Sequence, residues 1–571
     1  MGKKRWNSLS ENRENEIQEL MRDCSFPRPI AMFFVARGFK QKEVIPFLDP
    51  KLSALSDPFR FPGMKAACER LWAAIRDREP ILIHGDYDTD GVTATALLQS
   101  VLENNGAEVF SFIPHRFDDG YGFTPESLEK AMEVTNGRCK VLVTVDCGIT
   151  SSDAVRKADE EGVDVIVTDH HDAAEELPAA LALINPKLYD ELEDLQVLSG
   201  AGVAFKLCHA FVKYGRQNKL GGFTTKLEEY LDLVALGTVA DIVPLLGENR
   251  TMVKYGIQVL RKQMRPGVRA LIENSHLKSE IQPSDITFRL APRINAAGRV
   301  GDASAALQLL QSDDIVKAYE CANLLEKYNG IRQEKEQEIY EEAKRQIEEK
   351  IDLKNCYSIL VYGRDWHQGV IGIVASRLAR DYNRPAIVLT MHNDEAHGSG
   401  RSIADLNLIQ LLGRTSHLLE RFGGHPMAVG VGLKVDKIDE FSVELEKEVR
   451  HGLTRSDLDA VINYEGSVQI EEIDSEYFRL AEFLNPFGHS NTKPIYRFNE
   501  LEVVKCFPVG RRHCRGVLKH RSGSSIDFIA FNRSQEEFEG PLFDVLATPQ
   551  MNNYYQVQRP QLQILDLTPV Y

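Results

Sequence analysis

One octapeptide, HGDYDTDG, brings a histidine and three aspartates together at residues 84–91. The apolar run PILI precedes it and VTATALL follows it, so the cluster is predicted to lie where a buried strand ends and a helix begins. Carboxylates held this close repel one another, and a fold avoids such a cluster unless something compensates the charge. The octapeptide therefore points to bound cations.

Three further segments carry acids after apolar runs. Asp146 ends VLVTVD, Asp169, His170 and His171 follow VIVT, and Asp241 stands alone in YLDLVALGTVADIVPL. Carboxylates with imidazoles are the ligands that Mn²⁺ and Mg²⁺ accept, and two cations bridged by a shared carboxylate commonly cleave phosphoesters. Taken alone, Asp146 or Asp241 is equally well explained as a helix cap, and the tripeptide Asp169-His170-His171 as part of a surface loop. The agreement of all four segments favours a two-metal site.

Alternating strands and helices predict a mostly parallel α/β sheet, with strands at 81–84, 141–146 and 163–169 and helices at 91–102 and 152–161. A strongly charged helix follows up to residue 351; it links two domains or, alternatively, pairs as a coiled coil. A second α/β pattern places strands at 358–362 and 386–390 and helices at 370–380 and 406–422. Short strands then predict a small β-barrel, with strands at 502–506, 525–531, 544–548 and 561–566.

The bulk composition limits the class of protein. With 571 residues the chain is too long for one core and is expected to form three or four domains. We find no signal peptide, no apolar run long enough for a membrane span, and nine cysteines without a C-x-x-C pair, so we expect a cytoplasmic protein. The net charge of −16 argues against a surface coated for nonspecific DNA binding but not against a recessed groove.

HGDYDTDG, VDCGIT, TDHH and GTVADIVPL resemble the four motifs of the DHH phosphoesterase superfamily. Further segments extend the likeness from about residue 50 to the C-terminus: PHRFDDGYGF, FRLAPRINAAGRVGDA, WHQGVIGIVASRLA, GSGRS and RFGGHPMAVG. In this order they are similar to the RecJ family of bacterial exonucleases. The resemblance implies 5′→3′ hydrolysis of single-stranded DNA to 5′-mononucleotides, in DNA repair and recombination.

The resemblance also divides the chain. It implies a parallel-sheet DHH domain joined by a long helix to a smaller α/β DHHA1 domain, followed by an OB-fold β-barrel that binds single strands. We expect an N-terminal helical cap at 1–50, the DHH domain at 51–302, the connecting helix at 303–351, the DHHA1 domain at 352–455 and the OB-fold at 456–571. We expect a monomer, with a helicase and a single-strand-binding protein as partners.

A ligand set for two cations, Mn²⁺ or Mg²⁺, follows from the resemblance. One cation would be held by His84, Asp88 and Asp146; the second by Asp90, Asp146, His170 and Asp241. Asp86, Asp169 and His171 would then orient ligands or contact the phosphate, although Asp86 is also able to ligate directly. His171 is the best candidate to hydrogen-bond the scissile phosphate or to protonate the leaving 3′-oxygen; the alternative is a supporting residue without a direct role.

Substrate contacts are expected in three places. Arg116 and Tyr121 would hold the terminal 5′-phosphate or the first nucleotide, unless Arg116 pairs with Asp118 or Asp119. Arg293, Asn295 and Arg299 would form a clamp that holds a phosphate or lies close to the metals, at the hinge before the long helix. GSGRS and GGH are interpreted as glycine-rich turns whose N–H groups cradle phosphates, with side-chain contacts from Arg401, Ser402 and His425.

The last basic stretch, KCFPVGRRHCRGVLKHRSG, is predicted to bind single strands through Arg511, Arg512, Arg515 and Lys519. Phe507, Phe528 and Phe531 lie near it in sequence and are candidates for base stacking, although for each single ring a place in the barrel core is the favoured interpretation. Two other functions remain: a DHH phosphodiesterase of short oligoribonucleotides or cyclic dinucleotides, and an inactive single-strand-binding scaffold. DNA and RNA also remain alternatives, because no residue can be assigned to a 2′-hydroxyl.

Overall fold

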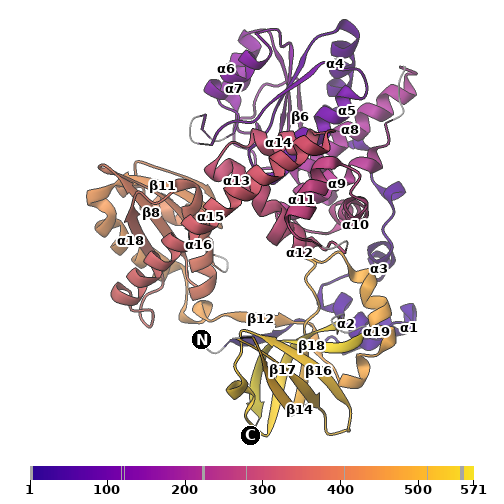
Figure 1. Cartoon of the computed structure of the whole chain (residues 1–571), viewed down its shortest axis with the longest axis vertical. Coiled ribbons are helices and arrows are strands. Elements are labelled where there is room, and N and C mark those ends of the chain that lie inside the picture. Colours follow the sequence, from indigo (N-terminus) through magenta and orange to yellow (C-terminus); the bar gives the residue numbers. More distant parts are fainter. Residues whose placement is uncertain are drawn as a thin grey trace.

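A five-stranded parallel sheet, in the order β3-β2-β4-β5-β6, forms the centre of the first module (Figure 1). The strands are β2 (Ile81–His84), β3 (Val109–Phe112), β4 (Val141–Val145), β5 (Asp164–Thr168) and β6 (Ala182–Ile184). This computed structural model describes residues 4–116, 119–120, 122–220, 225–277, 280–403, 406–510, 512–552 and 558–570. The predicted parallel sheet is confirmed.

Helices cover both faces of this sheet, as the continuous apolar strands require. Ile81, Ile83 and Val143 pack toward α4 (Met64–Asp77), α5 (Thr89–Glu103) and α8 (Gly200–Gln217). Leu82 and Leu142 face the opposite way, toward α6 (Pro125–Val134) and α7 (Ser152–Glu160). The carboxyl ends of β2, β4 and β5 are left at one common edge.

A helical region follows and leads out of the first module. It comprises α9 (Leu231–Ala240), α10 (Gly247–Lys262), α11 (Pro266–Asn274), α12 (Pro283–Asp285), the π-helix η6 (Ile286–Leu290), α13 (Ala291–Val300), α14 (Ser304–Gln311) and α15 (Ile315–Lys350). The connecting helix is α15, which has 36 residues. Asp314 is its N-cap, and the Asp314 carboxylate accepts the N–H of Val316. The apolar stretch that carries Asp241 is therefore a helix, with Asp241 at its end.

The second module has a five-stranded sheet in the order β10-β11-β9-β8-β7, in which only β7 and β8 run parallel. Its strands are β7 (Ile359–Arg364), β8 (Ala386–His392), β9 (Glu395–Arg401), β10 (Arg421–His425) and β11 (Ala428–Lys434); its helices are α16 (Gln368–Tyr382), α17 (Leu408–Arg414) and α18 (Ile438–Gly452). The predicted helix at 406–422 is wrong in its second half. After Arg414 the chain turns and forms β10, whose glycines pair with β11.

The third module is a closed five-stranded barrel. It contains β14 (Tyr496–Val509), β15 (His513–Lys519), β16 (Ser525–Phe531), β17 (Leu542–Asn552) and β18 (Arg559–Val570), and the pairing of β14 with β17 closes it. Closure leaves the barrel strands without an open edge. All four strands predicted here lie within observed ones.

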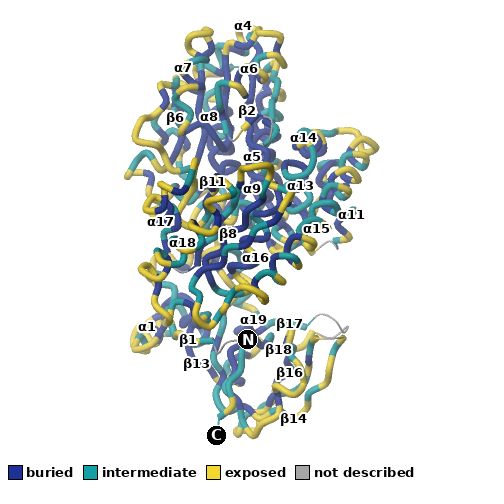
Figure 2. Tube along the Cα trace, turned by 90° about the vertical axis from the view of Figure 1, so that its left-hand side faces the viewer, coloured by how far each residue is buried: buried dark blue, intermediate teal, exposed yellow. Residues whose placement is uncertain are grey.

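The N-terminal segment packs on the barrel. It comprises β1 (Arg5–Ser8), α1 (Glu14–Cys24), α2 (Arg28–Ala36) and α3 (Gln41–Leu48), and β1 pairs in parallel with β12 (Val461–Tyr464). Phe33 and Phe34 share one apolar core with Tyr496 and Phe528 of the barrel. Figure 2 shows buried segments inside each module and exposed residues at the loops. None of the described helices is long and apolar enough to cross a membrane.

Candidate active site

Asp86 and Asp88 lie in the turn between β2 and α5, and Asp90 lies in the first turn of α5. Asp88 is the N-cap of α5: its Oδ1 accepts hydrogen bonds from the N–H groups of Asp90 (2.9 Å) and Gly91 (3.1 Å). Asp146 follows β4 with a φ of 62°, and His170 comes directly after Asp169 at the end of β5. Because β2, β4 and β5 are neighbours in a parallel sheet, their carboxyl ends bring these side chains together.

Two helices press against the acids from the other side. The Asp90 carboxylate accepts the N–H groups of Gly200 (2.6 Å) and Ala201 (2.9 Å) at the beginning of α8, which stabilises its charge. A Cβ on Gly200 would lie 2.3 Å from Asp146 Oδ1, and one on Gly237 of α9 would lie 2.4 Å from Asp90 Oδ1. Neither glycine can be recognised from the sequence, because a helical glycine carries no pattern that distinguishes close packing against an acid.

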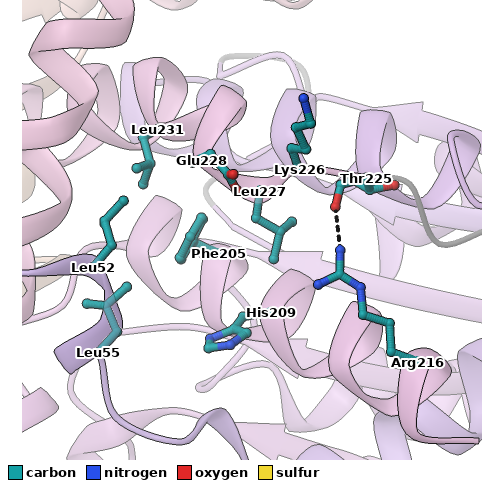
Figure 3. Close-up of a pocket in the computed structure, with 10 residues that line it drawn as sticks. All are labelled: Leu52, Leu55, Phe205, His209, Arg216, Thr225, Lys226, Leu227, Glu228 and Leu231. Carbon is teal, nitrogen blue, oxygen red and sulfur yellow. Dashed lines mark hydrogen bonds between the residues drawn. The ribbon is translucent and has the colours of Figure 1, made fainter.

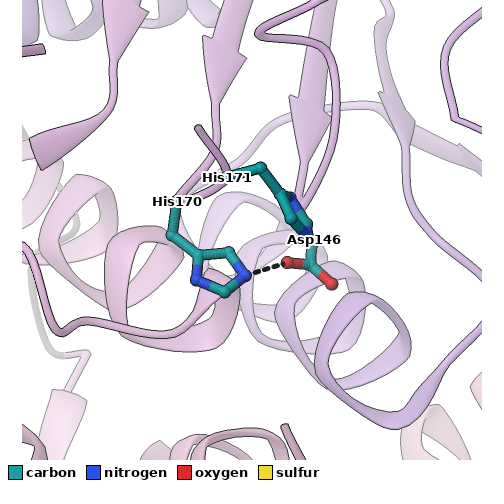
Figure 4. Close-up of side chains that lie close together, drawn as sticks. All are labelled: Asp146, His170 and His171. Atoms are coloured by element: carbon teal, nitrogen blue, oxygen red, sulfur yellow. Dashed lines mark ion pairs between the residues drawn. The ribbon is translucent and has the colours of Figure 1, made fainter. Parts of the chain in front are cut away.

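The side chains form three overlapping groups whose possible ligand atoms lie within 4.8 Å of one another: Asp86, Asp88 and Asp146; Asp146, His170 and His171; Asp90, His170 and Asp241. Figure 4 shows His170 pointing at Asp146. Its Nε2 lies 3.1 Å from Asp146 Oδ1, 3.6 Å from Asp241 Oδ2 and 4.0 Å from Asp90 Oδ2. Asp146 and His170 each belong to two groups, so they connect the cluster.

Burial dominates the electrostatics of the cluster. Burial and then the charge of Asp88 raise the pKa of Asp86 and of Asp90 to about 7. Burial, followed by the charges of Asp90 and Asp88, raises the pKa of Asp241 to about 9. Burial lowers the pKa of His170 to about 3, so this imidazole is neutral and keeps a lone pair for a ligand.

The cluster fits a pair of hard divalent cations. Asp86 Oδ1, Asp146 Oδ1 and His170 Nε2 are buried, and within the described ranges none of them has a hydrogen-bond partner. Buried polar atoms nearly always have such a partner in a folded protein. Carboxylate oxygens with one or two imidazoles are the donors that Mn²⁺ accepts, and Mg²⁺ prefers the oxygens.

Asp169 orients the two histidines. Its Oδ1 accepts the N–H groups of His170 (2.7 Å) and His171 (3.1 Å) and the Nδ1–H of His171 (2.7 Å), while its Oδ2 accepts the N–H of Ile149 (3.0 Å). Burial is the largest single effect and opposes the charge of His171. The hydrogen bond to Asp169 and the charges of Asp169, Asp241 and Asp86 together outweigh burial and raise the pKa of His171 to about 9. His171 is therefore a protonated imidazole beside the cluster.

The structure differs from the sequence analysis at His84. The residue still belongs to β2, and its Nε2 lies 3.0 Å from Ser127 Oγ on α6, while its Nδ1 lies 3.8 Å from Cys147 Sγ. None of the groups formed by the described residues includes His84. Asp86, which lies beyond the end of the strand, stands beside Asp88 and Asp146 where we expected His84.

Three arginines lie near one another beside the cluster. The guanidinium of Arg116 lies over the ring of Tyr87, 5.2 Å from its centroid. Burial and then the charge of Arg116 lower the pKa of Arg299 to about 10, and the same two causes lower the pKa of Arg401. The alternative pairing of Arg116 with Asp119 is not observed, because Asp119 binds Lys130 and the N–H of His115. Tyr121 and Asp118 lie outside the described residues.

Other residues of the predicted clamp have structural partners. Arg293 pairs with Glu326 of α15 and donates to the carbonyl of Arg289. Asn295 accepts the N–H (2.8 Å) and hydroxyl (2.9 Å) of Thr89, so it holds the beginning of α5 rather than a phosphate. The Ser402 hydroxyl is buried and donates to the carbonyl of Leu406 (2.7 Å). Of the three clamp residues, only Arg299 lies with the other arginines.

The two glycine-rich segments are strands, so their interpretation as phosphate-binding turns is wrong. GSGRS belongs mostly to β9, which pairs with β8 on one side and β11 on the other, so its N–H groups face sheet partners. RFGGH is β10. This strand nevertheless reaches the first module: the His425 ring stacks on that of His171 with 6.5 Å between centroids, and its Nδ1 lies 3.9 Å from Asp172 Oδ2.

The barrel places some of the predicted binding residues on its surface. Phe507 of β14 is opposite Arg515 of β15, and Phe507 and Phe531 are 53% and 48% exposed, whereas Phe528 belongs to the core. Arg512 and Lys519 are exposed, and Arg511 lies outside the described residues.

A separate pocket in the first module is lined by Leu52, Leu55, Phe205, His209, Arg216, Thr225, Lys226, Leu227, Glu228 and Leu231 (Figure 3). Arg216 donates to the carbonyl of Thr225 at 3.0 Å. The lining includes no acid of the metal cluster, so this pocket is not the candidate site.

Family models match each module in turn: the DHH family N-terminal domain at residues 80–238, the DHHA1 domain at 354–451 and the RecJ OB domain at 464–566. The single-stranded-DNA-specific exonuclease RecJ of Bacillus subtilis is 34% identical over 99% of this chain and 71% of its own. That of Dickeya dadantii is 37% identical over 92% of this chain and 93% of its own. The chain belongs to the RecJ family.

A solved member of the RecJ family has the same architecture. RecJ from Thermus thermophilus in complex with Mn²⁺ superimposes with a TM-score of 0.84, at 29% identity, over 99% of this chain and 80% of that one. Its complex with Mg²⁺ superimposes with a TM-score of 0.78, at 27% identity, over 99% of this chain and 79% of that one. The order of the DHH, DHHA1 and OB modules expected from the sequence is thereby confirmed.

Proposed function

We propose that this chain is a metal-dependent exonuclease that hydrolyses single-stranded DNA from the 5′ end and releases 5′-mononucleotides. The observation that carries the proposal is the buried cluster at the ends of β2, β4 and β5, in which Asp86, Asp146 and His170 each keep a buried atom that forms no hydrogen bond with the described residues. Relatives named single-stranded-DNA-specific exonucleases, which align with nearly the whole chain, supply the substrate class.

We assign two cations, Mn²⁺ or Mg²⁺, to the cluster. Asp86, Asp88 and Asp146 would hold one, and Asp90, Asp146, His170 and Asp241 the other, so that Asp146 is shared. Such cations supply Lewis acidity: they increase the acidity of water and neutralise charge on phosphoryl oxygens. His84 has no place in this assignment, since its ring is directed at Ser127.

His171 acts on the phosphate itself. Its Nδ1–H is held by Asp169, and its raised pKa, about 9, keeps the imidazole protonated at neutral pH. The ring therefore has a second N–H with which to hydrogen-bond the scissile phosphate or to donate a proton to the leaving 3′-oxygen. Asp169 stabilises the positive charge of the protonated His171 imidazole and fixes the orientation of its ring, as outer partners of a metal site commonly do.

A terminal 5′-phosphate is the ligand that suits Arg116, Arg299 and Arg401. Burial first, and then the charge of Arg116, lower the pKa values of Arg299 and Arg401. A phosphate monoester of about two negative charges would relieve the repulsion among the three cations. Arg299 donates to the carbonyl of Gly369, and Arg401 belongs to the same module, so the phosphate would be bound between the first and second modules. His425, beside His171, completes this surface.

The barrel binds the rest of the strand. Phe507 and Phe531 offer partly exposed rings near Arg515, a combination that holds single strands with little sequence preference. A helicase and a single-strand-binding protein would supply such strands to a monomeric, cytoplasmic enzyme in repair and recombination. A phosphodiesterase of dinucleotides has no need of this barrel, and an inactive scaffold has no need of buried acids that repel one another.

Degradation of a 5′-phosphorylated, 3′-fluorescent single strand in Mn²⁺, beside its duplex, tests the proposal. We expect labelled products that shorten stepwise from the 5′ end of the single strand only. Asp146→Asn should reduce the rate by more than about 10³-fold, because Asn tolerates the positive φ of this position but is a poor metal ligand. The matched control Asp153→Asn changes an exposed acid on α7.

Other outcomes would identify the alternatives. Immediate loss of the 3′ label would show that hydrolysis begins at the 3′ end. Hydrolysis restricted to dinucleotides would favour the smaller-substrate phosphodiesterase. Tight binding of single strands without hydrolysis, unchanged by chelation and by Asp146→Asn, would favour the inactive scaffold.

A further inference from the structure

Arg250, on α10 of the first module, is almost completely buried, with 1% of its surface exposed. All five of its N–H donors reach backbone carbonyls. Nε donates to Phe47 (3.0 Å), Nη1 to Leu484 (3.1 Å) and Pro486 (3.3 Å), and Nη2 to Phe483 (2.8 Å) and Asn485 (2.8 Å). The guanidinium also lies over the Phe47 ring, 3.7 Å from its centroid. One side chain of α10 thus binds two other, separate parts of the chain.

No carboxylate of the described residues pairs with this guanidinium, and burial lowers its pKa to about 9. A buried cation without a counter-ion is costly unless every donor is satisfied. Lysine has three donors, so it would leave at least two of these carbonyls without the bond they have now. Binding of all five carbonyls at position 250 therefore requires the donor geometry of arginine and not only its positive charge.

The carbonyls belong to the segments that carry the barrel. Phe47 lies in the last turn of α3, which packs in the barrel core, and residues 483–486 lead from α19 (Ser475–Ala481) toward β14. Asn491 reinforces the second segment by donating to the carbonyls of Leu484 (2.9 Å) and Pro486 (2.8 Å). Figure 1 shows α10 next to α3 and close to α19, at the junction of the first and third modules.

We propose that Arg250 is a positioning residue that fixes the barrel relative to the metal cluster and thereby determines how well the enzyme uses strands long enough to reach both. The inference rests on the proposed function, in which the barrel holds the strand whose end is cut. A rigidly placed second binding surface raises the effective concentration of the strand at the site, and a loosely attached one loses that gain.

The test compares the full-length wild type with Arg250→Lys on two single strands, a tetranucleotide and one of about 40 nucleotides that also reaches the barrel. We expect KM for the long strand to rise on the order of tenfold. The kcat and KM for the tetranucleotide should stay within about twofold, because the cluster is untouched. Small-angle scattering should show a larger maximum dimension for the variant. Lys262→Met removes an exposed cation at the end of the same helix and should change neither quantity.

Asn491→Ala provides a second variant that leaves Arg250 in place. It removes the two reinforcing bonds to the same segment and should raise KM for the long strand in the same direction, by less. Equal KM values for the long strand in wild type, Arg250→Lys and Asn491→Ala, with all three folded, would overturn the inference, as would a parallel loss of kcat on the tetranucleotide.

Binding measured by fluorescence anisotropy with the metal chelated separates this inference from the proposed function. If the wild type hydrolyses neither strand but Arg250→Lys still weakens binding of the long strand alone, the exonuclease proposal is wrong and the positioning role stands. If the wild type hydrolyses both strands and Arg250→Lys binds the long strand normally, the positioning role is wrong and the exonuclease proposal stands.

Discussion

Asp86 and Asp90 carry much of the electrostatic cost of the site, because each carboxylate is buried among other acids. In the folded, metal-free chain their pKa values are raised to about 7 from an ordinary value of 3.8. Between pH 4 and pH 7 the unfolded chain has therefore released protons that the folded chain still holds, so folded-state stability falls as pH rises through this window. Cations that replace those protons restore it.

The raised pKa values of Asp86 and Asp90 in the folded chain predict how stabilisation by Mn²⁺ depends on pH. At pH 5 protons compensate the cluster, whereas at pH 8 only cations do, so Mn²⁺ should raise Tm by at least about 5 °C more at pH 8 than at pH 5. Thermal unfolding followed by circular dichroism, in Mn²⁺ and in a chelator, measures the effect. An equal or larger shift at pH 5 would contradict the assigned ligands.

At the scale of the element, α8 approaches the cluster so closely that the positions of the acidic side chains depend on it. A methyl group on Gly200 would lie 2.3 Å from Asp146 Oδ1, whereas one on Gly202 of the same helix would meet only Leu198 at 3.3 Å and Met252 at 3.5 Å. Gly200→Ala should therefore displace the shared carboxylate and weaken Mn²⁺ binding about 10- to 100-fold, as loss of ligand support does. Calorimetric titration is the measurement, and Gly202→Ala, the control, should bind Mn²⁺ nearly as the wild type does.

Strands β14 and β16 should bind bases through the exposed rings of Phe507 and Phe531. Phe507, opposite Arg515, is 53% exposed, and Val504 of the same strand is 45% exposed. Phe507→Ala should weaken binding of a single strand by about 5- to 100-fold, the range expected when a stacked base loses its ring. Val504→Ala removes a side chain from the same strand without removing a ring. Similar anisotropy-derived Kd values for the two variants would exclude stacking at Phe507.

The sequence predicted these elements where the pattern is local. The apolar runs before Asp86, Asp146 and Asp169 identified β2, β4 and β5, and with them the edge at which the acids meet. GSGRS and RFGGH resemble turns in the sequence because they are rich in glycine, and only their pairing with β8 and β11 identifies them as strands. His84 was likewise assigned by motif, although the alternation of side chains along β2 directs its ring toward Ser127 on α6.

At the scale of the whole molecule, contacts between distant segments decide the arrangement. Phe33 and Phe34 complete the core of a barrel that begins far along the chain, at Tyr496, and Arg250 links both to the first module. No local pattern indicates such pairings. The net charge of −16 likewise gives no indication that Arg116, Arg299 and Arg401 cluster, since only the fold brings these cations together.

The most direct test of the central claim is an anomalous difference map from crystals of the full chain grown in Mn²⁺. The account predicts two peaks that share Asp146, one beside Asp86 and Asp88 and the other beside Asp90, His170 and Asp241. A single peak, or a peak held by His84 instead of Asp86, would contradict the two-metal assignment.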